Sequence, residues 1–341
     1  MAKQNLVKIR CSTSRLKKLC DDLSEKQKYF VRANGFGHFL NLSVFTVPIP
    51  LLEWVMRNFQ VGVKEFQYGD KRIRFTRAMI QQVFGFICGD TPVNLENVSA
   101  ELIEEARLVS VDYVINGRKP SIAEAVRLCL AENNEDAFMR SFMVVALGTL
   151  ICPNTQNSFD LNILSYLMRP AEIRNYDWAT FAFDYIIQEL LRFQENIASH
   201  DVHIRNNTHC YGSCLPLLVV VYMDFLDMNT EFGNAHVISY ALPRFCHVKT
   251  EDFSLVVDAD HVRFPLSENS VEFGVVPFRD ISHTPYHLPL DKIASIANLI
   301  KAHNPIDNDN ETDISISSER EEASSGNMNS YGAIRCDAAF D

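Results

Sequence analysis

The sequence predicts a mainly α-helical protein: an irregular multi-helix domain with a small β-hairpin, a looser mixed α/β C-terminal region and a disordered tail. Three observations support this prediction. Apolar residues recur at helical spacing through much of residues 12–227, one short stretch has the turn residues of a hairpin, and the composition becomes polar and acidic from residue 304 onward.

The strongest helical signal lies in residues 175–193, which are followed by a second apolar segment, residues 212–227. Apolar side chains in the first segment recur at three- and four-residue steps, as on one face of a helix. We expect this pair of helices to form the centre of the core. The predicted core residues are Trp54, Phe142, Trp178, Phe181, Tyr185, Ile186, Leu190, Leu218 and Tyr222.

Caps and breakers place the elements that precede this pair. An amphipathic helix starts near Ser14, and Ser24 with Gln27 has the spacing of a capping box for a helix that reaches residue 33. Residues 42–47 are expected to be extended, and the prolines at 48 and 50 suit the start of the next helix.

A hairpin is predicted from residues 64–68 and 72–75, because β-forming residues flank the turn pair Gly69-Asp70. Thr76 can cap a helix that Gly85 ends. Further helices are predicted at 100–111, 121–132, 134–152 and 159–168.

The chain changes character after residue 235. Five prolines interrupt residues 236–303, short β-type runs occur at 254–257 and 272–276, and a last helix is expected at 291–303. We therefore predict a helical module at 12–235, a mixed α/β extension packed on it at 236–303, and an acidic disordered tail at 304–341.

The composition argues against several classes of function. The net charge of −11 argues against a generally basic nucleic-acid surface, and the nine scattered cysteines are typical of reduced thiols inside a cell. The apolar run 215–223 is shorter than the ~20 residues that cross a bilayer, and Asp224 ends it. We expect a soluble protein, nuclear or cytoplasmic, without a membrane partner.

Residues 3–28 are locally basic. This segment suits either a nuclear-import or phosphate-contacting arm, or a solvated helix face, and its short cluster Arg15-Leu-Lys-Lys18 favours the solvated face. Arg72, Arg74, Arg77, Arg169 and Arg174 are candidates for local basic spots, so nucleic acid remains a possible, indirect partner.

Four blocks occur in a characteristic order: 15–27 with 35–42, then 71–76 with 80–86 and 88–89, then 138–153, and last 175–183 with 212–227. In this order they resemble the aminotransferase-like plant mobile domain. The order is also similar to the helical domain upstream of SUMO-type cysteine proteases in plant transposon-derived proteins. The resemblance covers roughly residues 12–230. It implies a helical, transposon-derived module, often nuclear, with no catalytic residues to carry over.

A SUMO-type protease needs a histidine, an aspartate and a glutamine before its cysteine nucleophile. His261 and Asp280 fit the first two positions, but the only later cysteine is Cys336, in the predicted disordered tail, and no glutamine follows Gln194. A loose tail cannot hold a nucleophile against its base. We therefore expect no protease activity and, with no intact catalytic set, no enzyme.

A histidine- and cysteine-containing loop is the one candidate for a metal site. Its candidate ligands are His200, His203, His209, Cys210 and Cys214. Zinc prefers such ligands, but the irregular spacing and the adjacency of His209 and Cys210 favour a polar loop with incidental histidines. No cofactor is expected either, because the glycine-rich phosphate loops of pyridoxal phosphate or nucleotide sites are missing.

These observations favour a non-catalytic protein-interaction module that is inherited from a transposon-encoded factor and whose protein partner the sequence does not identify. Two alternatives remain open: a truncated or degenerate relative of a SUMO-type protease, and a DNA-associated transposition factor.

Overall fold

The computed structural model of the chain describes residues 6–85, 89–114, 120–155, 158–201, 204, 207–228, 236–262 and 271–287. The chain divides into two compact units, Met1–Leu288 and Pro289–Asp341, and all described residues belong to the first. Among them, no helix combines the length and the apolar composition needed to cross a membrane. The predicted helix at 291–303 and the predicted tail lie outside the described residues.

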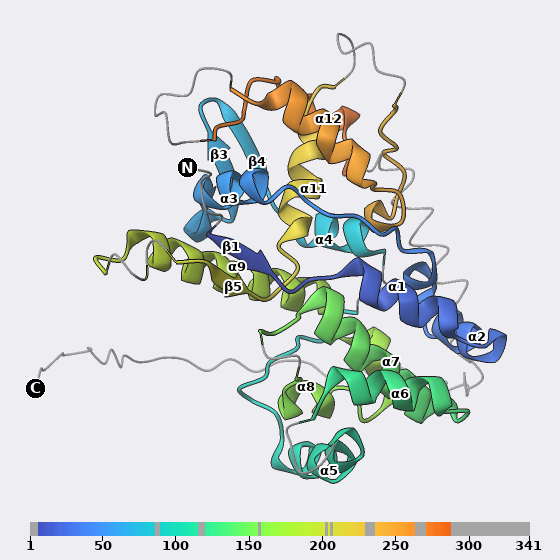
Figure 1. The fold of residues 1–341 in the computed structure, drawn as a ribbon. Helices are drawn as coiled ribbons and strands as arrows, with labels where there is room; N and C mark the ends of the chain where they lie inside the picture. Colours follow the sequence, from blue (N-terminus) through green and yellow to red (C-terminus); the bar gives the residue numbers. More distant parts are fainter. Residues whose placement is uncertain are drawn as a thin grey trace, which may run out of the picture. The chain divides into compact units, whose positions relative to one another are not determined.

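The described unit is mainly α-helical, as the sequence predicts (Figure 1). Its α-helices are α1 (Thr13–Asp22), α2 (Glu25–Ala33), α3 (Ile49–Arg57), α4 (Arg77–Phe84), α5 (Ala100–Ser110), α6 (Ile122–Ala131), α7 (Glu135–Ala146), α8 (Leu161–Ser165), α9 (Trp178–Ala198), α11 (Pro216–Phe225) and α12 (Thr250–Asp260). Its short 3₁₀ segments are η1 (Gly37–Asn41), η2 (Val61–Val63), η3 (Val111–Tyr113), η5 (Pro170–Asn175), η6 (Arg244–Cys246) and η7 (Ile281–His283), and η4 (Leu147–Ile151) is a π-helical end of α7.

Local capping signals fix several helix ends. The Ser24 side chain accepts from the backbone N–H of Gln27, and the Gln27 side chain accepts from the N–H of Ser24, which confirms the capping box of α2. Thr76 caps α4, and Gly85 ends it with a left-handed φ of 77°. These ends need only neighbouring residues, and the sequence alone therefore predicts them.

The predicted hairpin is present as β3 (Glu65–Tyr68) and β4 (Lys71–Arg74), with Gly69 in the turn at φ 59°. A third antiparallel strand, β2 (Phe59–Gln60), joins β3. A second sheet has two parallel strands, β1 (Val7–Ile9) and β5 (His209–Tyr211), from opposite ends of the helical region.

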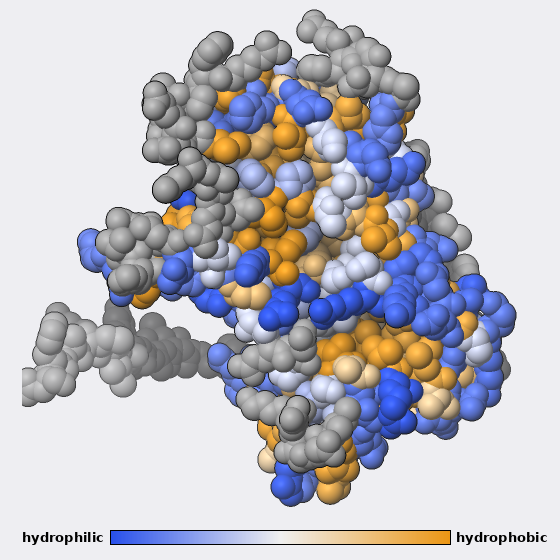
Figure 2. Space-filling view, in the orientation of Figure 1, coloured by the Kyte–Doolittle hydropathy of each residue, from blue (hydrophilic) through white to orange (hydrophobic). Residues whose placement is uncertain are grey.

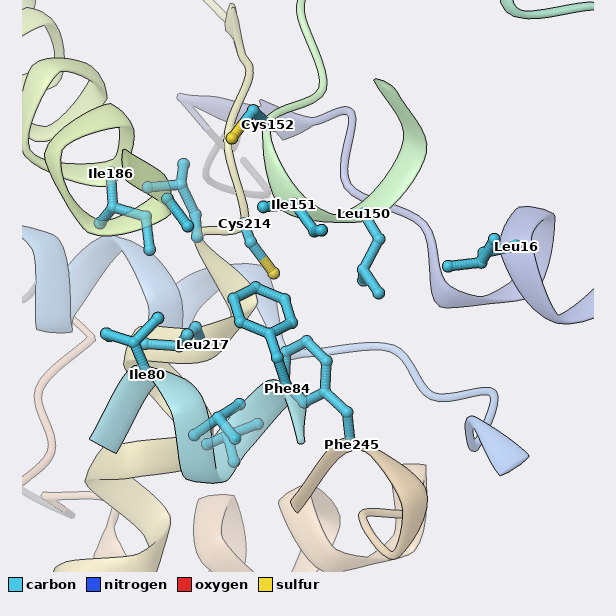
Figure 3. Close-up of a cluster of buried hydrophobic side chains, with 14 of the residues drawn as sticks. Leu16, Ile80, Phe84, Leu150, Ile151, Cys152, Ile186, Cys214, Leu217 and Phe245 are labelled. Carbon is cyan, nitrogen blue, oxygen red and sulfur yellow. The ribbon is translucent and has the colours of Figure 1, made fainter. Parts of the chain in front are cut away.

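The two expected central helices are α9 and α11. They make few direct contacts with each other, and each packs instead against both α3 and α4. The hub of the core therefore consists of four helices, α3, α4, α9 and α11 (Figure 1). All residues of α11 are buried. Figure 3 shows a cluster of buried hydrophobic side chains to which Ile80 and Phe84 of α4, Ile186 of α9 and Leu217 of α11 belong.

Most of the predicted core residues are buried at 4% exposure or less, namely Trp54, Phe142, Trp178, Ile186, Leu190, Leu218 and Tyr222. Phe181 and Tyr185 differ: both pack against the core but are only half-buried. Together with residues 92–96 they line a surface groove of about 390 Å³ along α9. The apolar face of this helix is therefore wider than the surface that the core covers.

The predicted β-type run 254–257 is wrong, because it lies inside α12. Phe253, Val256 and Asp260 are buried at three- and four-residue steps, which is helical and not strand periodicity. The run 272–276 forms no strand either. Phe273 makes one isolated bridge, and the carbonyls of Gly274 and Val276 accept from the Lys71 ammonium group.

Candidate protein-interaction groove

The β1–β5 sheet is built from residues that lie about 200 positions apart. The register pairs Val7 with His209 and Ile9 with Tyr211. A carboxylate of α3 fixes the start of β1, because Glu53 Oε1 accepts from the backbone N–H groups of Leu6 at 2.6 Å and Val7 at 3.1 Å. This contact places β1 beside α3.

The backbone hydrogen bonds show which edge of β1 is used. The N–H of His209 donates to the carbonyl of Leu6 at 2.8 Å, and the N–H of Arg10 donates to the carbonyl of Tyr211 at 3.1 Å. In a parallel ladder with this spacing, alternate residues of a strand bond to the same neighbour. The N–H and C=O of Ile9 therefore point away from β5, as on the edge of a sheet.

A groove of about 900 Å³ follows this strand. Four of its lining residues are consecutive, and the others come from the start of α3 and from β5 and the residue before it. The lining residues are Val7, Lys8, Ile9, Arg10, Ile49, Thr208 and Cys210. Figure 2 shows a band of hydrophilic side chains across this face of the molecule, with hydrophobic surface on both sides of it.

The groove carries positive charge. Strand side chains alternate between faces, so Lys8 and Arg10 share one face and Val7 and Ile9 share the other. Lys8 is exposed, and Val7 is 2% exposed and belongs to the core. The Nε atom of Arg10 is buried and has no hydrogen-bond partner among the described residues. Two of the seven lining residues are basic and none is acidic, although the whole chain carries −11.

Helix α9 holds the other strand in place. Arg192 donates to the carbonyl of Cys210 at 2.8 Å and lies 4.6 Å from the centre of the Tyr211 ring, in a cation–π contact. Glu189 accepts from both Arg192 and the backbone N–H of Gly212. Helix α9, the longest helix of the hub, therefore fixes the position of β5, which lines part of the groove.

The candidate metal ligands do not converge. His200 is exposed, the ring of His209 contacts the carbonyl of Ile204 at 2.6 Å, and Cys214 is fully buried at the start of α11. His209 and Cys210 are consecutive strand residues and point to opposite faces. His203 lies outside the described residues, and among the described ones no group of three or more metal-ligating side chains is close enough to hold an ion.

The two positions considered for a protease make separate local contacts. His261 pairs with Phe273 in an isolated bridge, and Asp280 caps η7 by accepting from the N–H of Ser282 at 2.8 Å. Cys336 lies outside the described residues. Among the described residues, the structure therefore shows no contact between His261 and Asp280.

Burial raises the pKa of the described core thiols. It raises the pKa of Cys20 to about 12 and that of Cys246 to about 11, and it also raises those of Cys129, Cys152 and Cys214. A thiolate is the reactive form of cysteine, so these burial effects oppose nucleophilic chemistry at neutral pH.

The arginines nominated as basic spots are partly neutralised. Arg77 pairs with both Asp90 and Asp177, and Arg169 pairs with Glu105. Arg174 is exposed, and its backbone carbonyl accepts from Gly89. Arg72 and Arg74 line a separate surface groove of about 470 Å³, together with the bases Lys71 and Arg279 and the carboxylates of Asp70 and Asp280. Carboxylates therefore lie near Arg72, Arg74, Arg77 and Arg169.

The sequence analysis missed the groove along β1. The segment 3–28 was interpreted as a basic arm or a solvated helix face, whereas its first described residues form a strand. The alternation of apolar and basic residues in Val7-Lys8-Ile9-Arg10 is the signal that indicates a half-buried strand. The stretch is short, and its partner strand lies near residue 210.

A family model described as "Domain of unknown function (DUF8566)" matches residues 9–219, which is more than half of the chain. Comparison with curated proteins finds no match, and comparison with solved structures finds none either.

Proposed function

We propose that this chain, which belongs to the family described as a domain of unknown function (DUF8566), is a non-catalytic protein-interaction module. The observation that carries the proposal is the basic groove along the edge of β1. Ile9 directs backbone hydrogen-bonding groups away from β5, and Lys8 and Arg10 place positive charge beside them.

The occupant that fits this groove is an extended segment of a partner protein that carries acidic residues. An exposed strand edge supplies backbone hydrogen bonds to an added strand, and pockets for alternate side chains supply selectivity. The apolar side of the groove, at Ile9 and Ile49, suits an aliphatic side chain of the segment. A carboxylate on the segment would pair with the exposed Lys8 and with the guanidinium of Arg10.

A peptide library tests this proposal. Random extended peptides displayed on phage are selected on the purified chain, and the affinities of the enriched peptides are then measured. We expect acidic residues alternating with aliphatic ones, because side chains of an added strand alternate between faces. Lys8→Glu and Arg10→Glu each weaken binding roughly tenfold or more, since they place like charges across the contact.

Lys18→Glu is the matched control. Lys18 is an exposed base of the same N-terminal region, but it lies on α1 and does not line the groove. The variant therefore leaves the affinity unchanged. Enriched peptides that ignore Lys8 and Arg10 would overturn the proposal. So would double-stranded DNA that binds the chain at ~0.2 M salt and loses affinity in both groove variants.

The resemblance to plant mobile domains supports a second part of the proposal, a transposon-derived origin and a place in the nucleus. A fluorescent fusion of the full chain tests the location in plant cells. The non-catalytic part rests on the raised pKa values of the core thiols, and a SUMO precursor incubated with the chain tests it. We expect the precursor to stay intact, and turnover that depends on one cysteine would instead indicate a protease.

A further inference from the structure

Two cysteines meet where the strands of the β1–β5 sheet end. The Sγ atoms of Cys11 and Cys214 are 3.3 Å apart, although 203 positions separate the residues. Cys11 follows β1 and precedes α1, and Cys214 follows β5 and precedes α11. Because β1 and β5 are parallel and in register, the chain leaves both strands in the same direction and brings the two thiols together.

Hydrogen bonds and close packing fix the chain around this contact. Ser213 has a left-handed φ of 60°, and its N–H donates to the carbonyl of Pro153 at 2.8 Å. Beside it, a Cβ atom on Gly212 would lie 2.3 Å from the same carbonyl oxygen. The Cys11 thiol also contacts the carbonyl of Leu150 at 3.5 Å. Neither cysteine therefore depends on a loose segment for its position.

The two thiols differ in access. Cys11 is half-buried, whereas Cys214 has no exposed surface, and burial raises its pKa well above the usual value. Figure 3 shows the Cys214 side chain within the apolar cluster near Phe84, with Cys152 on a neighbouring segment and pointing in a different direction. A small oxidant therefore reaches Cys11 first, and Cys214 is the nearest second thiol.

We propose that Cys11 and Cys214 form a disulfide when the chain meets a hydroperoxide. The Cys11 thiolate attacks the peroxide, so that an S–O bond forms, the O–O bond breaks and the peroxide leaves as an alcohol or water. Burial disfavours a free Cys214 thiolate, but this sulfur already lies 3.3 Å from the Cys11 sulfur. It therefore attacks the oxidised Cys11 sulfur as it loses its proton, and an S–S bond forms as the S–O bond breaks. The hydroxide that leaves takes the Cys214 proton as water, so two thiols are oxidised and one peroxide is reduced.

The geometry suits this reaction. A disulfide needs an S–S distance of about 2.05 Å, which is a small side-chain movement from the present contact. The bond would close a loop of about 200 residues, and long loops gain most from closure because the unfolded chain loses the most freedom. The oxidised chain therefore melts roughly 5–10 °C above the reduced chain.

Peptide mapping of the purified full chain tests the inference. The reduced protein is treated with hydrogen peroxide, its free thiols are alkylated, and the digest is analysed by mass spectrometry. We expect one linked pair of peptides that contain Cys11 and Cys214, which dithiothreitol separates. Cys214→Ser loses the linkage and accumulates a sulfenic acid on Cys11 that a 1,3-dione probe traps.

Cys246→Ser is the matched control, because Cys246 is also half-buried and its thiol also contacts a carbonyl, that of His38 at 3.4 Å. This variant retains the linkage. Two free thiols after peroxide treatment of the unsubstituted chain would overturn the inference, and so would a Cys11–Cys152 link. The peptide map of the unsubstituted chain tests the disulfide even if a variant folds poorly. The presence or absence of the link does not depend on whether the groove along β1 binds a partner.

Discussion

The two halves of α11 are held in different ways. Its first half, residues 216–221, consists of buried apolar residues, and the helix packs against α3 and α4 of the hub. Its second half carries Tyr222 and Asp224, which bond to groups from residues 236–287. The first half relies on packing volume alone, whereas the second combines aromatic packing, such as that of Tyr222 on Trp54, with matched polar partners that are buried.

The polar half centres on a fully buried ion pair. Arg244 donates to Asp224 through Nε at 2.7 Å and Nη2 at 2.9 Å, and the Tyr286 hydroxyl donates to the same carboxylate at 2.7 Å. Burial alone would lower the pKa of Arg244, but the adjacent Asp224 carboxylate outweighs burial and raises it. Nη1 of Arg244 also donates to the carbonyl of Ser239, so each charged group is well satisfied.

The two halves of α11 therefore differ in the substitutions that they tolerate. A packed apolar region accepts side chains of similar volume, whereas a buried ion pair fails when one partner is removed, because the other charge stays buried. Substitutions in each half, in residues that pack near them and at the surface can break or sharpen this contrast, and they follow from the largest expected effect to the smallest.

The largest effect is expected at the ion pair. Asp224→Ala leaves the Arg244 guanidinium buried without its counter-charge and lowers the free energy of unfolding by about 3–5 kcal/mol. Urea unfolding followed by circular dichroism measures the change. The double variant Asp224→Leu with Arg244→Met is the control, and it recovers much of the loss because no buried charge remains. An equally unstable double variant would show that packing, and not charge, dominates this half.

A loss of similar size is expected at Trp178, in the hub. Trp178→Ala removes a fully buried indole and costs about 3–5 kcal/mol. Trp178→Phe keeps most of the volume but loses the hydrogen bond from Nε1 to the carbonyl of Ile173, so it costs less. Thermal unfolding separates the variants, and an unchanged melting temperature for Trp178→Ala would place this side chain on the surface.

A volume-conserving change in the first half of α11 is expected to be mild. Leu218→Met keeps an apolar side chain of similar size at a fully buried position and costs less than about 1.5 kcal/mol. Denaturant unfolding measures this cost beside that of Asp224→Ala. Equal losses for the two variants would remove the distinction between the halves.

The polar half should also respond to pH through Asp260. Burial raises the pKa of this carboxyl, which accepts from the hydroxyl of Tyr222 and the N–H of Val276. The folded state then holds the proton more tightly than the unfolded state, whose pKa is about 3.9. This contribution to stability is present below about pH 3.9 and is lost as the pH rises through the higher folded value.

The comparison with Asp260→Asn isolates this effect, because the amide does not titrate. Stability is measured for both proteins from pH 3 upward by denaturant unfolding, and the unsubstituted chain loses stability relative to the variant as the pH rises. Parallel pH profiles would show that Asp260 titrates at its ordinary pKa.

The smallest effect is expected at the surface. Lys64 and Asp184 form an ion pair at 2.9 Å, and both side chains are about half exposed. Lys64→Ala changes the free energy of unfolding by less than about 1 kcal/mol, because water and salt screen such pairs. Calorimetry at low and high salt measures it, and a larger loss would indicate that the Lys64 contact with the Phe183 ring matters more than the charge.

The sequence predicts the features that depend on neighbouring residues. The capping box at Ser24, the stop at Gly85 and the turn at Gly69 each rest on a few adjacent positions, and all three are present. The face of α9 follows from its spacing, because Trp178 and Ile186 are buried as a helical period requires.

Features that depend on distant residues are not visible in the sequence. Asp224 was interpreted as the polar end of an apolar run, although it is fully buried, because its partner Arg244 lies beyond the helix. The groove along β1 depends on a parallel pairing across about 200 residues, which no local pattern specifies. The β-type run at 254–257 failed for a related reason, since a short apolar run does not distinguish a strand from one turn of a buried helix.

The most direct test of the proposed function is where a selected acidic peptide binds. Amide and methyl resonances of the isotopically labelled chain are followed while the peptide is added. We predict shifts at Val7, Ile9, Ile49 and Cys210, with loss of the response in Arg10→Glu. Shifts centred instead on Phe181 and Tyr185 would place the interaction in the groove along α9 and contradict the account.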